Sequence, residues 1–357
     1  MLKGLRIRNY RVFKDLKVDG LHRINLIAGK NNSGKTSLLE AIFLLAGGRN
    51  PQLAVNTNVM RMTGPDPIVA TPQALENTWK QMFHSLDTDI PISIDGCHEV
   101  HGPLALKVSL EPWQGTESLP PASLGGASPS EVPVGHSLTF RYKGSPGDDS
   151  LGQIRFRPTG TGGSVDVNQP GVSNSLEARI ILSRSGNVQE DATLLGKLRT
   201  QKRGDLLLDA LRVIEPNLES VEDSFASSVP MIWGDVGLSE LVPLPVMGEG
   251  MTRLARIVLG ISAVPGGVLL VDEIENGIHH SVMSKVWKAV SAAAKQFDVQ
   301  VFATTHSYEC FENAVNALGA EGFKFFRVGK TRSGEDEAVM YSPEMIDVAI
   351  RHYMEVR

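Results

Sequence analysis

The sequence predicts an α/β fold with a mainly parallel core sheet and an antiparallel β insertion. Three observations predict it. Short apolar runs alternate with segments of helical periodicity toward both ends of the chain, and a glycine-rich loop joins one such run to a helix. In the middle of the chain, short pieces in which apolar and polar residues alternate lie between glycine- and proline-rich stretches. Of the 357 residues, 41% are hydrophobic and 21% charged, a composition typical of globular proteins with a buried core.

The N-terminal segment is expected to form a hairpin, a buried strand and a helix. Leu5 and Ile7 alternate with arginines, which is typical of a half-buried strand. The apolar run at 24–28 leads into a glycine, and apolar residues between 38 and 45 then recur at helical spacing before a Gly-Gly pair ends the helix. We therefore expect the order strand, glycine loop, helix.

The middle of the chain, 51–204, is expected to be an insertion of antiparallel strands joined by long loops. It is rich in Gly, Pro, Ser and Thr, and the alternating pieces 138–142 and 154–156 are its clearest strands. The sequence contains no sustained heptad pattern and no repeat of fixed period. The remaining residues, 1–50 and 205–357, are predicted to form one discontinuous core.

The C-terminal part returns to alternating helices and strands. Residues 267–271 form an almost wholly apolar run, typical of a strand buried on both faces of a parallel sheet. The same reasoning predicts helices at 205–214, after Gly250, at 281–297 and at 307–318, strands near 221, 231–233, 299–304, 323–328 and 337–341, and a last helix opened by Ser342-Pro343.

Composition limits the ways in which the chain can meet a charged partner. With 40 acidic and 35 basic residues the formal net charge is −5, so there is no global positive field for nucleic acid or anionic lipid. Contact with DNA therefore needs a local patch. Residues 1–23 and the group Lys197, Arg199, Lys202 and Arg203 are two such patches, although basic runs are more often solvated faces.

Cysteine usage and hydropathy predict the compartment. Cys97 and Cys310 are far apart and outside any CxxC spacing, which argues against a disulfide framework and against a zinc site. The longest apolar stretch, 257–271, is interrupted by Pro265 and is shorter than the roughly 20 residues that span a bilayer. The N-terminus has no continuous signal-peptide core. We therefore expect a cytoplasmic protein without membrane contact.

A phosphate-binding motif follows the first buried strand. Residues 29–36 match the pattern GxxxxGK[ST] between a predicted strand and a predicted helix, where backbone N–H groups can surround phosphate oxygens; the alternative is a loop that only caps the helix. Lys35 is expected to reach the β- and γ-phosphates of ATP, and the Thr36 hydroxyl to bind Mg²⁺. The predicted nucleotide-binding residues are Gly29, Asn31, Asn32, Ser33, Gly34, Lys35, Thr36 and Ser37.

Two adjacent carboxylates end the apolar run at 267–271. Asp272 is expected to hold the metal ion, and Glu273 to act as the general base toward the attacking water. His306 follows the strand at 299–304, and because the carboxyl ends of parallel strands meet at one edge of a sheet, we expect it at the γ-phosphate. Alternatively, the carboxylates are solvated groups at a strand end and the histidine is structural.

Several stretches of the sequence together resemble a known family. They are the strand pair RNY-VF, GKNNSGKTS, VDEIENGIHHS, ATTHS and the closing helix that begins SPE and ends VR. The combination resembles the ABC-class ATPases of the SMC, RecF and OLD group, and within it the compact OLD-like AAA-family ATPases of prokaryotes, over nearly the whole chain. The resemblance implies an ABC-type P-loop ATPase head that hydrolyses ATP in nucleic-acid metabolism or phage defence.

The resemblance also implies that ATP is held between two heads. The phosphate-binding loop of one head then faces a signature loop of the other, which 247–254 matches here. Gly248 stands where the family has a phosphate-contacting serine, so Gly248 and Gly250 are expected to act through backbone N–H groups. Arg253, on one helix face with Arg256, is either a charge stabiliser in trans or an ordinary surface arginine.

The resemblance assigns three further groups. Residues 276–279 occupy the loop that contacts the second head in the family, although Asn-Gly is also a common turn. Gln81 is the candidate for a glutamine that senses Mg²⁺. Tyr10 and Phe13 either flank the adenine or belong to the core.

We expect a homodimer or higher oligomer and a separate protein partner, a nuclease or effector. About fifty residues follow His306 (357 − 306 = 51), too few for the C-terminal Toprim nuclease domain of full OLD proteins. Direct contact with DNA is a further expectation. Two other functions stay open: a regulatory module that binds nucleotide with little turnover, and an ATP-binding subunit of an ABC transporter. The transporter predicts an LSGGQ loop and a clear glutamine loop, and the sequence has neither.

Overall fold

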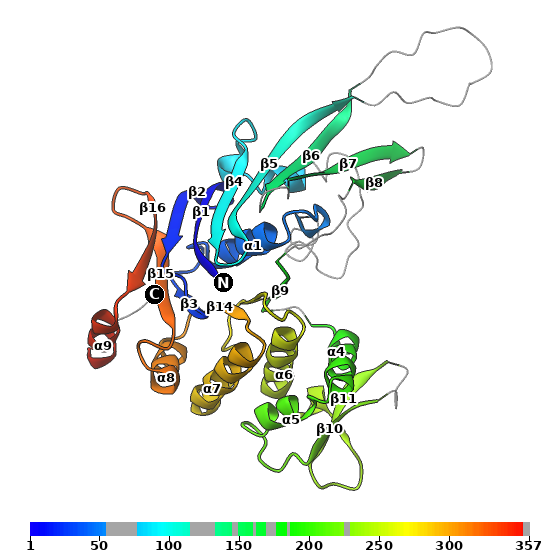
Figure 1. Ribbon diagram of the computed structural model, residues 1–357, viewed down its shortest axis with the longest axis vertical. Helices are drawn as coiled ribbons and strands as arrows, with labels where there is room; N and C mark the ends of the chain where they lie inside the picture. Colours follow the sequence, from blue (N-terminus) through cyan, green and yellow to red (C-terminus); the bar gives the residue numbers. More distant parts are fainter. Residues whose placement is uncertain are drawn as a thin grey trace, which may run out of the picture.

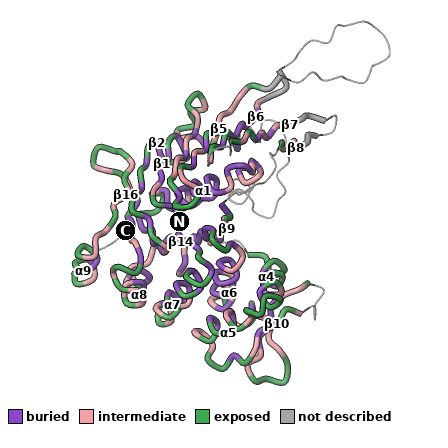
Figure 2. Tube along the Cα trace, in the orientation of Figure 1, coloured by how far each residue is buried: buried purple, intermediate pink, exposed green. Residues whose placement is uncertain are grey.

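Helix α1 (Lys35–Ala46) lies between two large sheets and contacts strands of both (Figure 1). The computed structural model describes residues 1–54, 77–114, 133–144, 149–159, 162–168, 176–183, 186–224 and 229–352. Eleven of the twelve residues of α1 are buried, and Figure 2 shows this buried helix beside the buried strands. The helix that follows the phosphate-binding motif is therefore held on both sides.

The first large sheet is antiparallel throughout. Its strands, in spatial order, are β2 (Phe13–Asp19), β1 (Leu2–Tyr10), β4 (Ile92–His98), β5 (Gly102–Gln114), β6 (Pro133–Lys143), β7 (Ser150–Thr159) and β8 (Gly162–Asn168). The predicted N-terminal hairpin and the predicted antiparallel strands of the middle region are confirmed. They belong to one sheet, because β4 pairs with β1 of the hairpin.

The second large sheet, the core sheet, is mainly parallel. Its strands, in spatial order, are β16 (Asp336–Tyr341), β15 (Lys324–Lys330), β3 (Ile24–Ala28), β14 (Gln300–Thr304), β13 (Val268–Val271) and β9 (Ala178–Ile181). The pairs from β15 to β9 are parallel, and only the edge strand β16 is antiparallel to its neighbour. The predicted fold class, α/β with a mainly parallel core sheet and additional antiparallel strands, is confirmed.

Helices cover the face of the core sheet opposite α1 (Figure 1). Further helices in the described part of the chain are α4 (Val188–Thr200), α5 (Asp205–Leu211), α6 (Glu249–Ser262), α7 (His280–Gln296), α8 (Tyr308–Leu318) and α9 (Pro343–Arg351), with 3-10 turns η1 (His84–Leu86) and η2 (Leu244–Met247). A small antiparallel sheet holds β10 (Ser220–Ser224), β11 (Met231–Asp235) and β12 (Val242–Pro243). All elements predicted after residue 205 are present in the predicted order.

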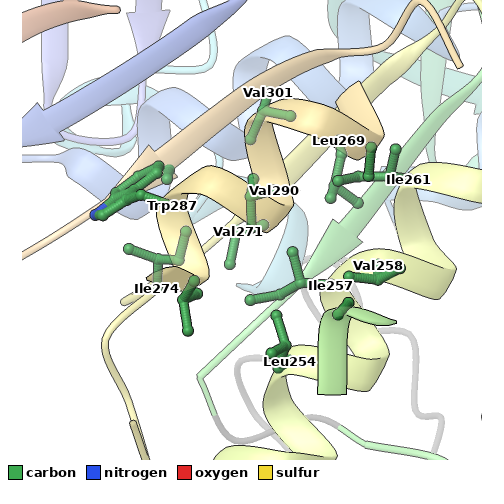
Figure 3. Close-up of a cluster of buried hydrophobic side chains, with 14 of the residues drawn as sticks. Leu254, Ile257, Val258, Ile261, Leu269, Val271, Ile274, Trp287, Val290 and Val301 are labelled. Carbon is green, nitrogen blue, oxygen red and sulfur yellow. The ribbon is translucent and has the colours of Figure 1, made fainter. Parts of the chain in front are cut away.

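Alternate residues of β13 point into two different cores. Val268 and Leu270 pack with α1 and the antiparallel sheet, whereas Leu269 and Val271 pack with α6 and α7. Figure 3 shows the second core, in which side chains of α6 lie against those of β13, α7 and β14. Burial on both faces explains why this strand is apolar without alternation.

The core extends further toward the N-terminus than the predicted boundary at 205. Strand β9 pairs in parallel with β13, and α4 contacts α6, although both elements lie within the predicted insertion 51–204. The sequence of β9 is too short to reveal this, because a parallel strand is joined to its partner by a long connection and carries no local turn signal. None of the helices in the described part of the chain is long and apolar enough to cross a membrane.

Candidate nucleotide site

The loop 29–34 joins β3 to α1 in a conformation that its glycines permit. Gly34 has φ 104°, and a Cβ there would lie 2.5 Å from the ring of Phe13. A Cβ at Gly29 would lie 2.4 Å from the carbonyl oxygen of Val328. Since Gly34 is the N-cap of α1 and has no side chain to occupy the first-turn amides, these N–H groups are available to an anion.

Lys35 is turned back onto this loop. Its Nζ donates to the carbonyl oxygens of Gly29 at 2.8 Å and of Lys30 at 3.0 Å, and the residue is only 5% exposed. Burial lowers the pKa of Lys35 to about 8, against the opposing effect of Asp272, Glu273 and Glu275. The ammonium is therefore poorly solvated, and phosphate oxygens are strong partners for it.

Two oxygen-bearing side chains meet where Mg²⁺ is expected. The hydroxyl of Thr36, at the start of α1, donates to both carboxylate oxygens of Asp272, at 3.2 and 3.3 Å. Asp272 follows β13, is 8% exposed, and accepts a further hydrogen bond from Thr304 Oγ1 at 2.6 Å. A hydroxyl and a carboxylate are the hard oxygen ligands that Mg²⁺ prefers, so the pair fits that ion.

Glu273 and His306 face each other across the ends of β13 and β14. His306 Nε2 lies 3.8 Å from Glu273 Oε1, and the two side chains are 33% and 39% exposed, respectively. Both line a pocket of about 540 Å³ together with residues of the phosphate-binding loop. Its lining residues are Val12, Asn31, Asn32, Gly34, Lys35, Thr36, Ser37, Glu273 and His306.

A second pocket of about 330 Å³ adjoins the first on the other side of the loop. The two share Val12, Asn31 and Asn32, and Ser33 lines the second one. Its remaining lining residues are Lys30, Arg327, Val328, Gly329, Lys330 and Asp336. Of the predicted nucleotide-binding residues, only Gly29 lines neither pocket, and it contributes a carbonyl oxygen to Lys35 instead.

None of the predicted signature residues lines either pocket. Gly248 is exposed at the N-cap of α6, and Gly250 lies in the first turn of that helix. A Cβ at Gly250 would lie 2.8 Å from the carbonyl oxygen of Gly277, so the start of α6 packs directly on the loop 276–279. The signature loop and this second loop therefore form one surface.

Arg253 is buried and binds groups of its own chain, which corrects the expectation that it stabilises charge in trans or lies on the surface. It is 5% exposed, and its guanidinium donates to the carbonyl oxygens of Leu182, Asp272 and Glu273. Burial lowers its pKa below the usual value. The sequence places Arg253 and Arg256 on one face of α6, and in the structure this face packs on β13 and α4. Arg256 bonds Asp191 of α4 at 3.0 Å.

Gln81 is exposed and is not among the described residues that line either pocket. The carbonyl oxygen of the next residue, Met82, accepts the N–H of Arg11 at 2.8 Å, which places this turn beside the β1–β2 turn that carries Val12. A role of Gln81 at the metal stays a prediction. Tyr10 and Phe13 are 0% and 1% exposed, so both belong to the core.

Sequence reasoning missed an ion pair that fixes the β1–β2 turn. Arg11 Nε lies 2.8 Å from Glu40 Oε2 of α1, with side chains 9% and 1% exposed. Tyr10 Oη donates to the same carboxylate at 3.3 Å. The signal available in the sequence was Glu40, which lies on the apolar face of the predicted helix. A charge buried there needs a partner. The pair ties Val12 to the phosphate-binding helix.

Six of the seven basic residues within 1–23 form ion pairs, which reduces their availability to nucleic acid. The pairs are Lys3–Glu99, Arg6–Asp15, Arg8–Asp95, Arg11–Glu40, Lys17–Asp19 and Arg23–Asp298. In the second basic group, Arg199 pairs with Asp223 at 2.9 Å, and Arg203 lies 5.1 Å from the ring centre of Phe297.

Comparison with known families and proteins agrees with this geometry. Residues 1–113 match a family described as "AAA ATPase domain", and residues 174–311 match one described as "AAA domain, putative AbiEii toxin, Type IV TA system". The chain is 26% identical over 330 residues to an ATP/GTP phosphatase of Helicobacter pylori, with 87% of each chain covered. The first match includes the phosphate-binding loop, and the second includes Asp272, Glu273 and His306.

Two shorter matches are to proteins named for DNA replication or repair. Over 84 residues the chain is 38% identical to the DNA replication and repair protein RecF of Acinetobacter baumannii, covering 24% of this chain and 23% of RecF. Over 62 residues it is 40% identical to the DNA double-strand break repair Rad50 ATPase of Archaeoglobus fulgidus, covering 17% and 7%. A solved SMC head bound to the C-winged helix domain of ScpA aligns over 98% of this chain and 99% of that one, at 14% identity and a TM-score of 0.48.

The fold and the site define a P-loop ATPase head, in which a phosphate-binding loop and the carboxylates of a neighbouring strand meet at one sheet edge. Within that class, the two AAA ATPase-domain matches and the similarity to an ATP/GTP phosphatase support an ATPase of the ABC, SMC and RecF type.

Proposed function

We propose that this chain binds ATP with Mg²⁺ at the loop 29–36 and couples its hydrolysis to the assembly of two heads. The observation that carries the proposal is the convergence of Lys35, Thr36, Glu273 and His306 on one pocket. They come from α1 and from the ends of two neighbouring strands, and such convergence from separate elements marks a site. The adjoining pocket gives room for the nucleoside beside the triphosphate.

The phosphates take over the hydrogen bonds that the loop supplies. Lys35 exchanges its two carbonyl partners for oxygens of the β- and γ-phosphates, and the first-turn amides of α1 hold the same groups. The Ser33 hydroxyl is buried and has no hydrogen-bond partner within the described residues. A phosphate oxygen would satisfy it, since buried polar groups are almost always paired.

Thr36 and Asp272 are the residues that would hold Mg²⁺, with Gln81 as a third candidate. Bound Mg²⁺ neutralises charge on the β- and γ-phosphate oxygens. Thr304 holds Asp272 in place through its 2.6 Å hydrogen bond, so the carboxylate is oriented before the nucleotide arrives.

Glu273 is the general base of the reaction. Its carboxylate takes a proton from water, the water oxygen bonds to the γ-phosphorus, and the bond from that phosphorus to the bridging oxygen breaks, with its electron pair leaving on ADP. His306, 3.8 Å from the carboxylate, restrains it and faces the γ-phosphate. The same pair argues against a regulatory module without turnover, because such a module needs no base beside the phosphates.

The Glu273→Gln variant tests this assignment. It should bind ATP as the wild type does and hydrolyse it about 10²-fold more slowly or worse, because an amide cannot accept the proton. Steady-state ATPase assays and calorimetry measure the two properties, and Glu222→Gln, an exposed carboxylate of β10, is the matched control. Hydrolysis at the wild-type rate in Glu273→Gln would refute the role of this residue.

Assembly of two heads would bring the signature surface of one chain to the nucleotide of the other. Gly248 is exposed and Gly250 packs on the loop 276–279, so both loops are placed to act on a second molecule. If hydrolysis dissolves the assembly, Glu273→Gln should form dimers or larger oligomers in ATP and Mg²⁺. Light scattering after size exclusion distinguishes this from a monomer, which would count against the two-head arrangement.

The setting we propose is DNA metabolism, since RecF and Rad50 relatives are named for DNA replication and repair. Phage defence is the other setting that the family resemblance implies, and either one requires a nuclease or effector partner. Because most N-terminal basic residues are paired, direct DNA contact would use Lys197, Lys202 and Arg203. Binding of a DNA duplex measured at low and high salt tests this, since phosphate contacts weaken steeply with salt.

A further inference from the structure

The loops that follow β13 and β14 are cross-linked in both directions. The hydroxyl of Thr304, the last residue of β14, accepts the backbone N–H of Glu273 at 2.8 Å. In return, Oε1 of Glu275 accepts the backbone N–H of His306 at 2.8 Å. A main-chain bond from the N–H of Ile274 to the carbonyl oxygen of Thr304, at 3.1 Å, lies between these two. The end of β14 therefore holds the main chain of Glu273, and the loop after β13 holds the main chain of His306.

Glu273 needs such support because its backbone is strained. Its φ is 50°, in the left-handed region that a side chain with a Cβ rarely adopts. Conformations of this kind persist only where the surroundings over-determine them. Thr304 holds the N–H of Glu273, and Arg253 Nη2 holds its carbonyl oxygen at 3.1 Å. The strained residue is thus fixed at both ends by side chains from other elements.

The side chains of Glu273 and His306 are not themselves enclosed. They are 39% and 33% exposed and 3.8 Å apart. With one-third of each side chain open to solvent, their separation depends on where their main chains are held. Thr304 also donates to Asp272 at 2.6 Å, so one hydroxyl connects the proposed metal ligand with the backbone of the proposed base.

We propose that Thr304 and Glu275 are positioning residues, which set the distance between Glu273 and His306 and thereby the rate of hydrolysis. The inference rests on the proposed function of that pair. Neither residue lines the 540 Å³ nucleotide pocket, so at saturating Mg²⁺ their loss should leave ATP binding largely intact while it misplaces the base. A displacement of about 1 Å at a reacting group can lower a rate by up to about 10²-fold.

Paired variants separate positioning from a merely structural role. Thr304→Val removes the hydroxyl and Thr304→Ser keeps it; Glu275→Ala removes the acceptor and Glu275→Gln keeps an oxygen at Oε1. We expect the first variant of each pair to lower kcat roughly tenfold or more with little change in KM for ATP, and the second to restore most of the rate. Thr304→Val combined with Glu275→Ala should lose less than the product of the two effects, because both act on one pair.

Matched controls remove similar groups elsewhere. Thr139→Val takes a buried hydroxyl from β6, and Glu344→Gln changes an exposed carboxylate at the start of α9; both should keep the wild-type kcat. Thermal melting confirms that each variant folds, and calorimetry confirms its ATP affinity.

Two results would overturn the inference. One is a wild-type kcat in folded Thr304→Val and Glu275→Ala. The other is a rise in KM that accompanies a lowered melting temperature and that Thr304→Ser and Glu275→Gln do not reverse. If the inference fails in this way while Glu273→Gln is still slow, the proposed function survives. If Glu273→Gln hydrolyses ATP normally, the proposed function itself has failed.

Discussion

The two large sheets contribute unequally to the proposed nucleotide site. Three neighbouring strands of the core sheet, β3, β14 and β13, end at it and deliver the phosphate-binding loop, His306 and the two carboxylates. Among the residues that the structure describes, the antiparallel sheet delivers only the β1–β2 turn with Val12. The difference follows from strand direction, since parallel strands bring all their carboxyl ends to one edge, whereas neighbouring antiparallel strands end at opposite edges.

The charged groups beside the two sheets differ in their exposure to solvent. On the antiparallel sheet, Arg6 and Asp15 pair at 2.6 Å with side chains 49% and 42% exposed. Beside the core sheet, Arg253 and Asp272 are 5% and 8% exposed and bind other elements. Exposed pairs are weak, whereas buried charges require fixed partners. Apart from the buried Arg11–Glu40 pair at the β1–β2 turn, the core sheet is therefore where a change in charge should alter the site.

The largest expected effect is at the phosphate-binding loop. Lys35→Ala should abolish detectable ATP binding, because it removes the cation that the loop holds next to the β- and γ-phosphates. Calorimetry measures the loss, and Lys285→Ala, an exposed lysine of α7, is the control. Unchanged ATP affinity in Lys35→Ala would mean that the nucleotide binds elsewhere.

Equal loss of packing in the two sheets should have unequal functional results. Leu269 of β13 and Ile154 of β7 are both fully buried, so each change to alanine should lower the free energy of unfolding by about 2–5 kcal/mol. Only Leu269→Ala should also lower kcat, since β13 carries Asp272 and Glu273 at its end. Denaturant unfolding and ATPase assays test the pair, and an equal loss of kcat in both would contradict the division of labour.

A similar contrast is expected for two arginines. Arg253→Met leaves three carbonyl oxygens without their donor, and we expect a loss of about 2–3 kcal/mol in stability together with a lower kcat. Arg6→Met breaks a half-exposed pair and should cost at most about 1 kcal/mol with no change in kcat. Chemical denaturation measures the free energy of unfolding of both variants. Equal losses of stability would show that burial does not determine how much each arginine contributes.

The smallest expected effect is a change in the protonation of Lys35. Because the pKa of Lys35 is lowered to about 8 from 10.5, the unfolded chain binds more protons than the folded one between these values, and the contribution of Lys35 to the free energy of unfolding rises with pH in that window. ATP holds Lys35 in its charged form, so binding at about pH 9 should take up part of a proton.

Calorimetry in two buffers of different ionisation enthalpy measures this uptake directly. Lys35→Arg, whose guanidinium stays charged throughout the range, should lack it. A binding enthalpy that is the same in both buffers for the wild type would show that Lys35 is already fully charged in the free protein.

Much of the fold could be predicted from the sequence, because the type of an element depends on local periodicity. The apolar run 267–271 and the helical pattern after Gly250 identify β13 and α6 without knowledge of any distant residue. Strand β9 could not be assigned, since four residues carry little periodicity and its partner β13 lies far along the chain. The predicted boundary at 205 differs from the structure for this reason.

The same distinction applies to the site. Residues 29–36, Asp272, Glu273 and His306 could be predicted from the sequence alone as site residues, because a phosphate-binding loop and the polar residues at strand ends are local patterns whose chemistry follows from residue type and spacing. What only the tertiary structure decided is which remote groups hold them. Arg253 turns inward, and Thr304 and Glu275 bind each other's loops, because β13 and β14 pair in a register that no local pattern specifies.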